Sequence, residues 1–299
     1  MPKTQEMLTI NKRTATKWFV GVLVLIIFGF GWMWWRANYQ NTTRVFWDMI
    51  DNNLSLASVT KHNYQSQQGS STDQYTQVQF GKLSASHGLS TVKQQGNSVS
   101  SETIGTKYND YSRYLSIQTA QKTSAGKSVD TSKFTGIWGK TTDAPKGQVA
   151  SVQYYQQSVL GVVPHGSFTR EQRRSLIEVI QNNKTYELGN VKSEKQGKRA
   201  VYVYDVKISP QGLITMLAQY AKELGLGDIG LNPKQYVGSP AVKTKFTVDK
   251  LSHQLLKVKY ESNNQEETYS SVGLEQTVLL PVKTIPIAEL QNKVVQSLK

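Results

Sequence analysis

The chain has 299 residues, with 35 Lys and Arg against 21 Asp and Glu, a formal net charge of +14 and no cysteine. The lack of cysteine excludes disulfides, a thiolate nucleophile, thiolate metal sites and lipid attachment at a lipobox cysteine. The basic residues are dispersed and form no compact patch with aromatic residues, so we expect no nucleic-acid partner.

Residues 18–35 form an uncharged, apolar run. At about 1.5 Å per residue, a helix of this length just crosses a hydrocarbon core of roughly 30 Å. Aromatic residues suited to the headgroup layers stand at both ends of the run: Trp18, Phe19, Trp32, Trp34 and Trp35. Arg36 follows in place of a small-residue cleavage site, which favours an uncleaved membrane anchor over a cleaved signal peptide.

Basic residues are denser before this run than after it, which predicts a cytoplasmic amino terminus. Lys3, Lys12, Arg13 and Lys17 precede the run, whereas Arg36 and Arg44 follow it. We therefore expect a single-pass cell-membrane protein whose carboxyl-terminal domain lies outside. The predicted parts are a cytoplasmic tail (1–17), a transmembrane helix (18–35), a juxtamembrane linker (36–41) and an extracytoplasmic α+β domain (42–299).

The predicted domain opens with a helix over residues 42–59, capped by Thr42 or Thr43. Its buried stripe has three- and four-residue spacings: Phe46, Met49, Ile50, Asn53 and Leu54. Residues 62–158 then show short alternating stretches, which predict antiparallel strands with one wet face. The alternation places three sets of residues on shared faces: Thr76, Val78 and Phe80; Tyr111, Leu115 and Ile117; Val152 and Tyr154.

Two further helices are predicted, one on each side of a strand. Residues 169–182 form the first, with Thr169 and Gln172 at capping-box spacing. The strand covers residues 201–208 and presents Tyr202, Tyr204, Val206 and Ile208 on one face. Ser209 caps the second helix, Pro210 suits its first turn and Gly225 its end. The buried stripe of this helix is Leu213, Leu217, Tyr220, Ala221 and Leu224.

A hairpin follows, in which residues 242–249 and 255–260 alternate around a turn. A third strand over residues 268–274 continues the meander. Pro286 then leads into a closing helix with Ile287, Leu290, Val294 and Leu298 on its apolar side.

The stretches SPQGLITMLAQY and VKTKFTVDKLSHQLLKVKYE, within this order of elements, resemble the LolA and LppX superfamily. The resemblance implies a strongly curved, mostly antiparallel open sheet, a half-barrel, packed on several helices. It also implies a cavity between sheet and helices, in which members hold lipids, lipoproteins or other hydrophobic ligands. Such relatives often have a lipobox cysteine or a cleaved signal, whereas this chain keeps a membrane helix. A tethered protein could take a ligand from its own membrane.

No catalytic or metal-binding pattern is present in the sequence. Gly225, Gly227 and Gly230 have the spacing of a phosphate loop, but they follow a helix and run into Pro233, so they predict a helix-ending loop. The four histidines are scattered: His62, His87, His165 and His253. We expect no enzyme activity, no cofactor and no metal.

Two functional interpretations remain. In the first, the domain binds a lipid or other hydrophobic ligand in a cavity lined by Tyr202, Tyr204, Leu217, Tyr220 and Phe246, although each of these residues could equally belong to a filled core. In the second, the domain is a non-enzymatic envelope scaffold or adhesion module. Its dispersed basic residues would then contact anionic cell-wall polymers or a protein partner.

Overall fold

The computed structural model describes residues 29–81, 84–120, 126, 128–142, 153–263, 265–274 and 277–298. The chain divides into two compact units, Met1–Val45 and Phe46–Lys299.

In the first unit, residues 29–35 are helical and continue into a π-helical turn, η1 (Arg36–Gln40). The helix breaks at Asn41, whose backbone is extended with φ −81° and ψ 95°. The Asn41 side chain accepts a hydrogen bond from the Arg44 amide at 3.1 Å and so caps α2 (Thr42–Asn53). The predicted cap at Thr42 or Thr43 is therefore wrong by one or two residues.

Most of the predicted membrane span lies outside the described residues. Residues 18–28, with Trp18 and Phe19, belong to that part, whereas Trp32, Trp34 and Trp35 lie in the described helical stretch. Within the described ranges, no helix combines the length and apolarity needed to cross a membrane.

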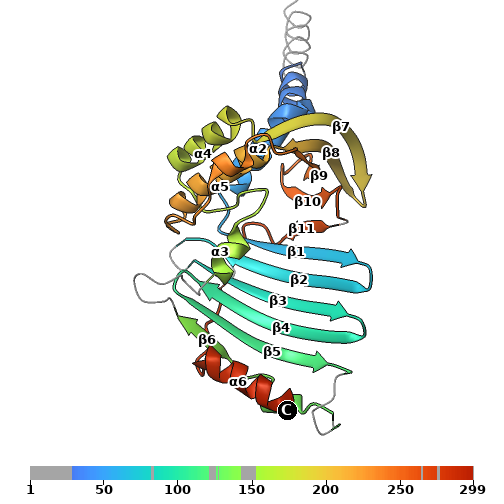
Figure 1. Ribbon diagram of the computed structural model, residues 1–299. Helices are drawn as coiled ribbons and strands as arrows, with labels where there is room; N and C mark the ends of the chain where they lie inside the picture. The colour runs from blue at the N-terminus through green and yellow to red at the C-terminus, as the bar shows by residue number, and fades with distance from the viewer. Residues whose placement is uncertain are drawn as a thin grey trace, which may run out of the picture. The chain divides into compact units, whose positions relative to one another are not determined.

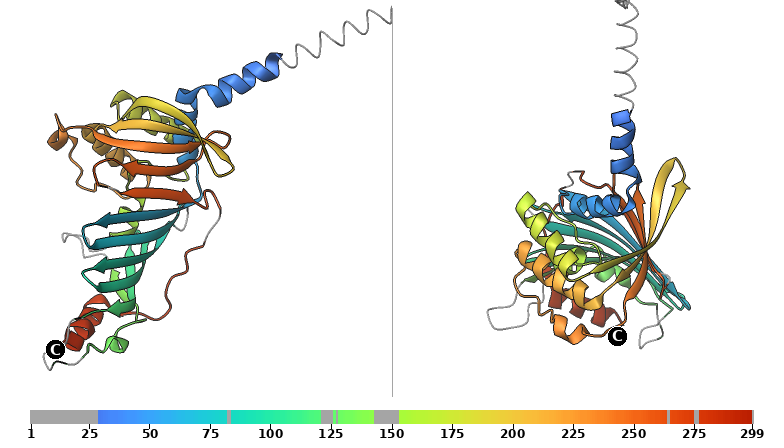
Figure 2. Two further views of the ribbon diagram at one scale, coloured as in Figure 1. Left: turned by 90° about the vertical axis from the view of Figure 1, so that its right-hand side faces the viewer. Right: turned by 90° about the horizontal axis from the view of Figure 1, so that it is seen from above.

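The second unit is built on one sheet of twelve described strands, with the order β12-β6-β5-β4-β3-β2-β1-β11-β10-β9-β8-β7. The strands are β1 (Ser58–Gln67), β2 (Ser70–Gln79), β3 (Ala85–Gln94), β4 (Asn97–Thr106), β5 (Asn109–Gln118), β6 (Gly139–Thr142), β7 (Tyr186–Gln196), β8 (Arg199–Ile208), β9 (Val242–Asp249), β10 (Leu255–Tyr260), β11 (Glu266–Ser270) and β12 (Ile285–Pro286). Every pair is antiparallel except β12 with β6. The predicted α+β class with a curved, mostly antiparallel open sheet is confirmed (Figures 1 and 2).

The sheet consists of two wings that meet at one seam. The first wing comprises β1–β6 with β12, and the second comprises β7–β11. The seam is the antiparallel pairing of β1 with β11, in which Thr60 lies opposite Ser270 and Tyr64 opposite Glu266. Neighbouring strands within each wing are otherwise mostly consecutive hairpins, as Figure 1 shows.

The helices of the second unit lie against particular parts of this sheet. The helix α3 (Tyr154–Val159) packs on β2, β3 and β4, while α4 (Arg170–Asn182) packs on α5 (Pro210–Glu223). At the far end of the first wing, α6 (Ile287–Leu298) packs on β6 and β12 (Figure 1). Two short 3₁₀ turns complete the described elements, η2 (Thr131–Lys133) and η3 (Pro233–Tyr236).

Several local predictions are confirmed. Thr169 and Gln172 form the expected reciprocal capping box of α4. The Ser209 side chain accepts a hydrogen bond from the Gly212 amide and so caps α5. The loop interpretation of the glycine triplet also holds, because Gly225, Gly227 and Gly230 all have positive φ and follow α5.

Three other predictions are wrong. The first helix ends at Asn53 rather than near residue 59, since the chain enters β1 at Ser58. Tyr154 lies in α3 rather than in a strand, and Val152 lies outside the described residues. Tyr111 and Ile117 do not share a face, because a bulge opposite Ser100 and Ser101 shifts the alternation of β5.

An aromatic core fills the space between α2 and the second wing. The ring of Phe46 lies 5.7 Å from that of Tyr186, 5.5 Å from Tyr204 and 6.0 Å from Phe246. Phe46, Tyr204 and Phe246 are all fully buried. Burial of such rings, with edge-to-face contacts among them, fixes α2 on the sheet.

Candidate polar ligand pocket

One row of residues crosses both wings on the helix-covered face of the sheet. Strand register places the following residues side by side in this row: Gln74, Asn63, Glu267, Val258, Phe246 and Tyr204. The first three are polar and belong to β2, β1 and β11, whereas the last three are apolar or aromatic and belong to β10, β9 and β8. Phe46 of α2 covers the aromatic half of the row. The polar half of the row lies beside α3.

Two glycines allow α3 to approach the first wing closely. A Cβ atom on Gly88 would lie 1.5 Å from the Tyr154 hydroxyl oxygen, and one on Gly105 would lie 2.5 Å from the Tyr155 backbone nitrogen. A Cβ atom on Gly105 would displace the backbone of α3, and one on Gly88 would displace the Tyr154 ring or the helix that carries it. A glycine inside a strand commonly marks such a close approach of another segment.

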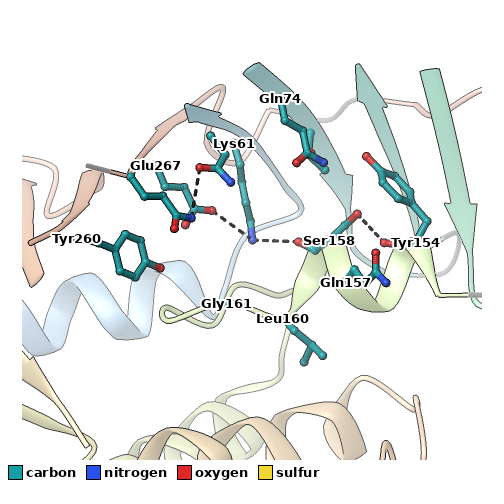
Figure 3. Close-up of a pocket in the computed structure, with 12 residues that line it drawn as sticks. Lys61, Gln74, Tyr154, Gln157, Ser158, Leu160, Gly161, Tyr260 and Glu267 are labelled. Atoms are coloured by element: carbon teal, nitrogen blue, oxygen red, sulfur yellow. Dashed lines mark hydrogen bonds and ion pairs between the residues drawn. The ribbon is translucent and has the colours of Figure 1, made fainter. Parts of the chain in front are cut away.

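A polar pocket of about 270 Å³ lies between the sheet and α3 (Figure 3). Strand residues supply its floor, and α3 with the following loop supplies the opposite wall. The lining residues are Lys61, Asn63, Gln74, Thr76, Tyr154, Gln157, Ser158, Leu160, Gly161, Tyr260, Gln265 and Glu267. Because β1 and β2 face β10 and β11 across the seam, both wings contribute to this one pocket.

Lys61 is the distinctive residue of the pocket because it is a lysine with only 6% of its surface exposed. Its ammonium group donates to the Ser158 carbonyl at 3.0 Å and lies 3.9 Å from a carboxylate oxygen of Glu267. Burial lowers the pKa of Lys61, and the neighbouring Glu267 carboxylate partly opposes that shift. An ammonium group has three N–H donors, so Lys61 can donate to a ligand oxygen in addition to Ser158.

The amide side chains of the pocket add groups that both donate and accept. Gln265 donates to the Asn63 side-chain oxygen at 3.4 Å, which orients both amides across the seam. On the opposite side, hydrogen bonds from Thr76 and Gln74 partly offset the rise that burial causes in the pKa of the Tyr154 phenol. The pocket is therefore lined by neutral hydrogen-bonding groups around one opposite-charge pair.

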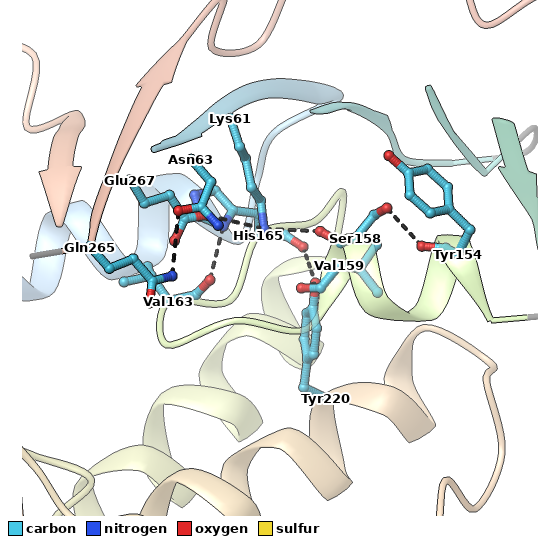
Figure 4. A network of polar contacts seen from close by, with 10 residues as sticks. All are labelled: Lys61, Asn63, Tyr154, Ser158, Val159, Val163, His165, Tyr220, Gln265 and Glu267. Carbon is cyan, nitrogen blue, oxygen red and sulfur yellow. Dashed lines mark hydrogen bonds and ion pairs between the residues drawn. The ribbon is translucent and has the colours of Figure 1, made fainter. Parts of the chain in front are cut away.

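A buried network behind the pocket fixes the loop that follows α3 (Figure 4). The His165 ring nitrogen Nδ1 lies 2.9 Å from the Val163 carbonyl, and the Tyr220 hydroxyl donates to the His165 carbonyl at 2.6 Å. The His165 ring also stacks on Tyr269, with centroids 5.1 Å apart. Burial, together with the positive charge of Lys61, holds the pKa of His165 well below its usual value. His165 is consequently neutral at physiological pH and supports the loop as a structural residue.

The five residues predicted to line an apolar cavity all lie in the interior: Tyr202, Tyr204, Leu217, Tyr220 and Phe246. Tyr204 and Phe246 pack under Phe46, while Tyr220 of α5 binds the loop after α3. None of the five lines the pocket around Lys61. Their contact with a ligand remains a prediction.

The sequence interpretation missed Lys61 and Glu267. Lys61 stands in an alternating strand, where a lysine normally marks the wet face. Two signals favoured the opposite reading: Lys61 has the same parity as the apolar Val59, and glycines at 88 and 105 interrupt the strands nearby. A polar residue on an apolar strand face, beside strand glycines, indicates a pocket under a packed segment.

No protein-family model matches the chain, and no curated protein matches its sequence. The chemistry of the site therefore rests on its own residues. Within the part of the chain that the structure describes, no group of three or more histidine and acidic residues could hold a metal ion. The pocket can orient and desolvate a small hydrogen-bonding molecule through Lys61, the amides and the two tyrosines.

Proposed function

We propose that the chain is a membrane-anchored extracytoplasmic binding protein that holds a small polar ligand in the Lys61 pocket. The observation that carries this function is a buried lysine facing a polar pocket at the seam of the two wings. Burial of a charged amine costs free energy, and a protein keeps such a group mainly where it has a partner or a function. The pocket binds its ligand without changing it chemically.

The polar lining favours a polar ligand over an acyl chain. Asn63, Gln74 and Gln265 have donors and acceptors that a hydrocarbon chain could not satisfy, and an unpaired buried polar group costs about 1–3 kcal/mol. The aromatic half of the same row is filled by Phe46. A lipid held in the manner of the LolA and LppX superfamily would need space in that aromatic half.

The anchor and its orientation belong to the same proposal. Residues 1–17 form the cytoplasmic tail, 18–35 the span, 36–41 the linker and 42–299 the external domain, whose sheet forms a half-barrel. The large exposed surfaces of Trp32 (63%) and Trp34 (60%) support contact with a bilayer interface. Carbonate washing of membrane vesicles should leave the full-length chain in the pellet, and protease added outside whole cells should digest the domain. Release by carbonate would contradict the anchor.

The binding function can be tested on full-length protein in detergent by thermal unfolding with added compounds. The panel consists of neutral sugars, dicarboxylates, amino acids and palmitate. A polar compound at 100 times its dissociation constant stabilises the folded state by about 2.7 kcal/mol, which raises the midpoint by several degrees.

The matched variants are the double substitution Lys61→Met/Glu267→Gln, which removes both charges together, and Gln211→Ala, which alters an exposed amide of α5. The polar compound should stabilise wild type and Gln211→Ala but not the double variant. Stabilisation by palmitate alone, retained in the double variant, would contradict a polar ligand and support the lipid interpretation.

A further inference from the structure

The charges that line the pocket cancel. Lys61 and Glu267 are the two charged residues among the twelve lining residues, and their charged groups lie 3.9 Å apart. An anion drawn to Lys61 would approach Glu267, and a cation drawn to Glu267 would approach Lys61. The repulsion would largely offset the attraction in either case, so the lining favours a ligand with no net charge.

The remaining polar groups match hydroxyl groups. Asn63, Gln74, Gln157 and Gln265 each offer an N–H₂ donor and a carbonyl acceptor. A hydroxyl group also donates and accepts, so several hydroxyls on one small ring satisfy such amides pairwise. Lys61 and Glu267 add one strong donor and one strong acceptor at the centre.

Aromatic rings lie at the two ends of the pocket. In Figure 3, Tyr260 stands at one end and Tyr154 at the other, with Lys61 and Glu267 between them. The ring faces of tyrosine provide rigid apolar surface at low entropic cost, suited to the C–H face of a sugar ring. The volume of about 270 Å³ leaves room for one such ring.

We propose that the Lys61 pocket binds a single neutral saccharide unit. This rests on the proposed binding function and adds the class of ligand. Both ends of the unit contact tyrosine, while its hydroxyls pair with the amides of the two wings and with Lys61 and Glu267.

The test is calorimetric titration of the full-length protein in a phosphocholine detergent, which carries no sugar headgroup. The probes are glucose, galactose and N-acetylglucosamine, with glucuronate and glucosamine as charged counterparts of the same ring. We expect saturable binding of at least one neutral sugar, with a dissociation constant at least tenfold lower than for either charged ring.

Two variants keep the fold while altering the site. Gln157 is exposed at the rim of the pocket and Asn63 is half-buried. Gln157→Ala and Asn63→Ala should each weaken sugar binding about tenfold or more, while Gln211→Ala on α5 should leave it unchanged. Circular dichroism shows that each variant is folded before titration.

Three other outcomes would contradict the saccharide inference, and one of them would also contradict the proposed binding function. Binding of glucuronate in preference to every neutral sugar contradicts the saccharide inference but retains the polar-ligand function. Sugar binding that is unchanged in Gln157→Ala and Asn63→Ala places the sugar elsewhere and contradicts the inference. If no polar compound binds at millimolar concentration, both the inference and the proposed function fail.

Discussion

The hydroxyl of Tyr154 lies against the backbone of Gly88, so close that a Cβ atom on Gly88 would stand 1.5 Å from the phenolic oxygen. This contact seats the first turn of α3 on β3 and sets one end of the pocket. The position of Tyr154 in the pocket wall therefore depends on the absence of a side chain at Gly88.

Gly88→Ala should destabilise the fold by about 1–3 kcal/mol, because Tyr154 must leave its site or the helix must shift. Urea unfolding measures this loss. In a Tyr154→Ala background the added methyl meets no ring, so the same substitution should cost little. An equal loss in both backgrounds would show that the Tyr154 contact is not the cause.

Phe46→Ala should cost about 3–5 kcal/mol, since the ring is fully buried among Tyr186, Tyr204 and Phe246. Denaturant titration of the full-length chain is the measurement. Phe46→Leu keeps most of the volume and should lose less. Tyr236→Ala, at a partly exposed position on η3, serves as the control and should change stability by about 0.5 kcal/mol or less.

The pH dependence of stability should carry a contribution from His165. Its folded-state pKa is held well below the usual value, first by burial and then by Lys61. The unfolded chain binds a proton below about pH 6.5 and the folded chain does not, so stability is greatest above that pH and falls as the pH drops below it. From pH 7.5 to 5.5 the loss attributable to His165 is on the order of 1 kcal/mol, because the unfolded chain takes up the proton over that range.

His165→Gln removes this titration and keeps a side-chain donor for the Val163 carbonyl. Urea unfolding of wild type and variant at pH 7.5, 6.5 and 5.5 compares the two slopes, above the range in which most carboxylates titrate. The variant should have the shallower slope. Parallel slopes would mean that His165 takes up a proton in the folded state.

Thr169→Ala should reduce stability by about 1 kcal/mol, because the Thr169 side chain accepts the Gln172 amide at the start of α4. Thr169→Ser keeps the hydroxyl and should retain most of that stability. Thermal or urea unfolding of the two variants gives the comparison. A serine variant as unstable as the alanine variant would assign the loss to the methyl group rather than to the cap.

The predictions that were confirmed depend on near neighbours in the chain. The α4 capping box needs only Thr169 and Gln172, and the cap of α5 needs Ser209 and Gly212. Alternation over a few residues likewise predicts that Tyr202 and Tyr204 point to the same side of β8, and both are buried. Such features can be predicted from the sequence because the interactions that determine them join residues only a few positions apart.

The candidate site was not predicted, because it depends on distant segments. Lys61 is buried only because α3 and the loop after it arrive from nearly a hundred residues further on, with Ser158 as its acceptor. The helix α3 has six residues, too few for a helical stripe to be distinguished from strand alternation. The bulge in β5 likewise depends on the pairing of β5 with β4, and the sequence of β5 alone does not predict it.

The pairing of β1 with β11 joins the beginning of the folded domain to a strand close to its end. Closing so long a loop costs chain entropy before any contact repays it, and such topologies fold slowly. Hairpins of either wing can assemble earlier from sequential partners. The pocket, however, forms only when β1 and β11 have paired. A molecule bound in it contacts residues on both sides of the seam. Occupancy would thus stabilise the pairing of β1 with β11, and slower amide hydrogen exchange along these two strands would report that stabilisation.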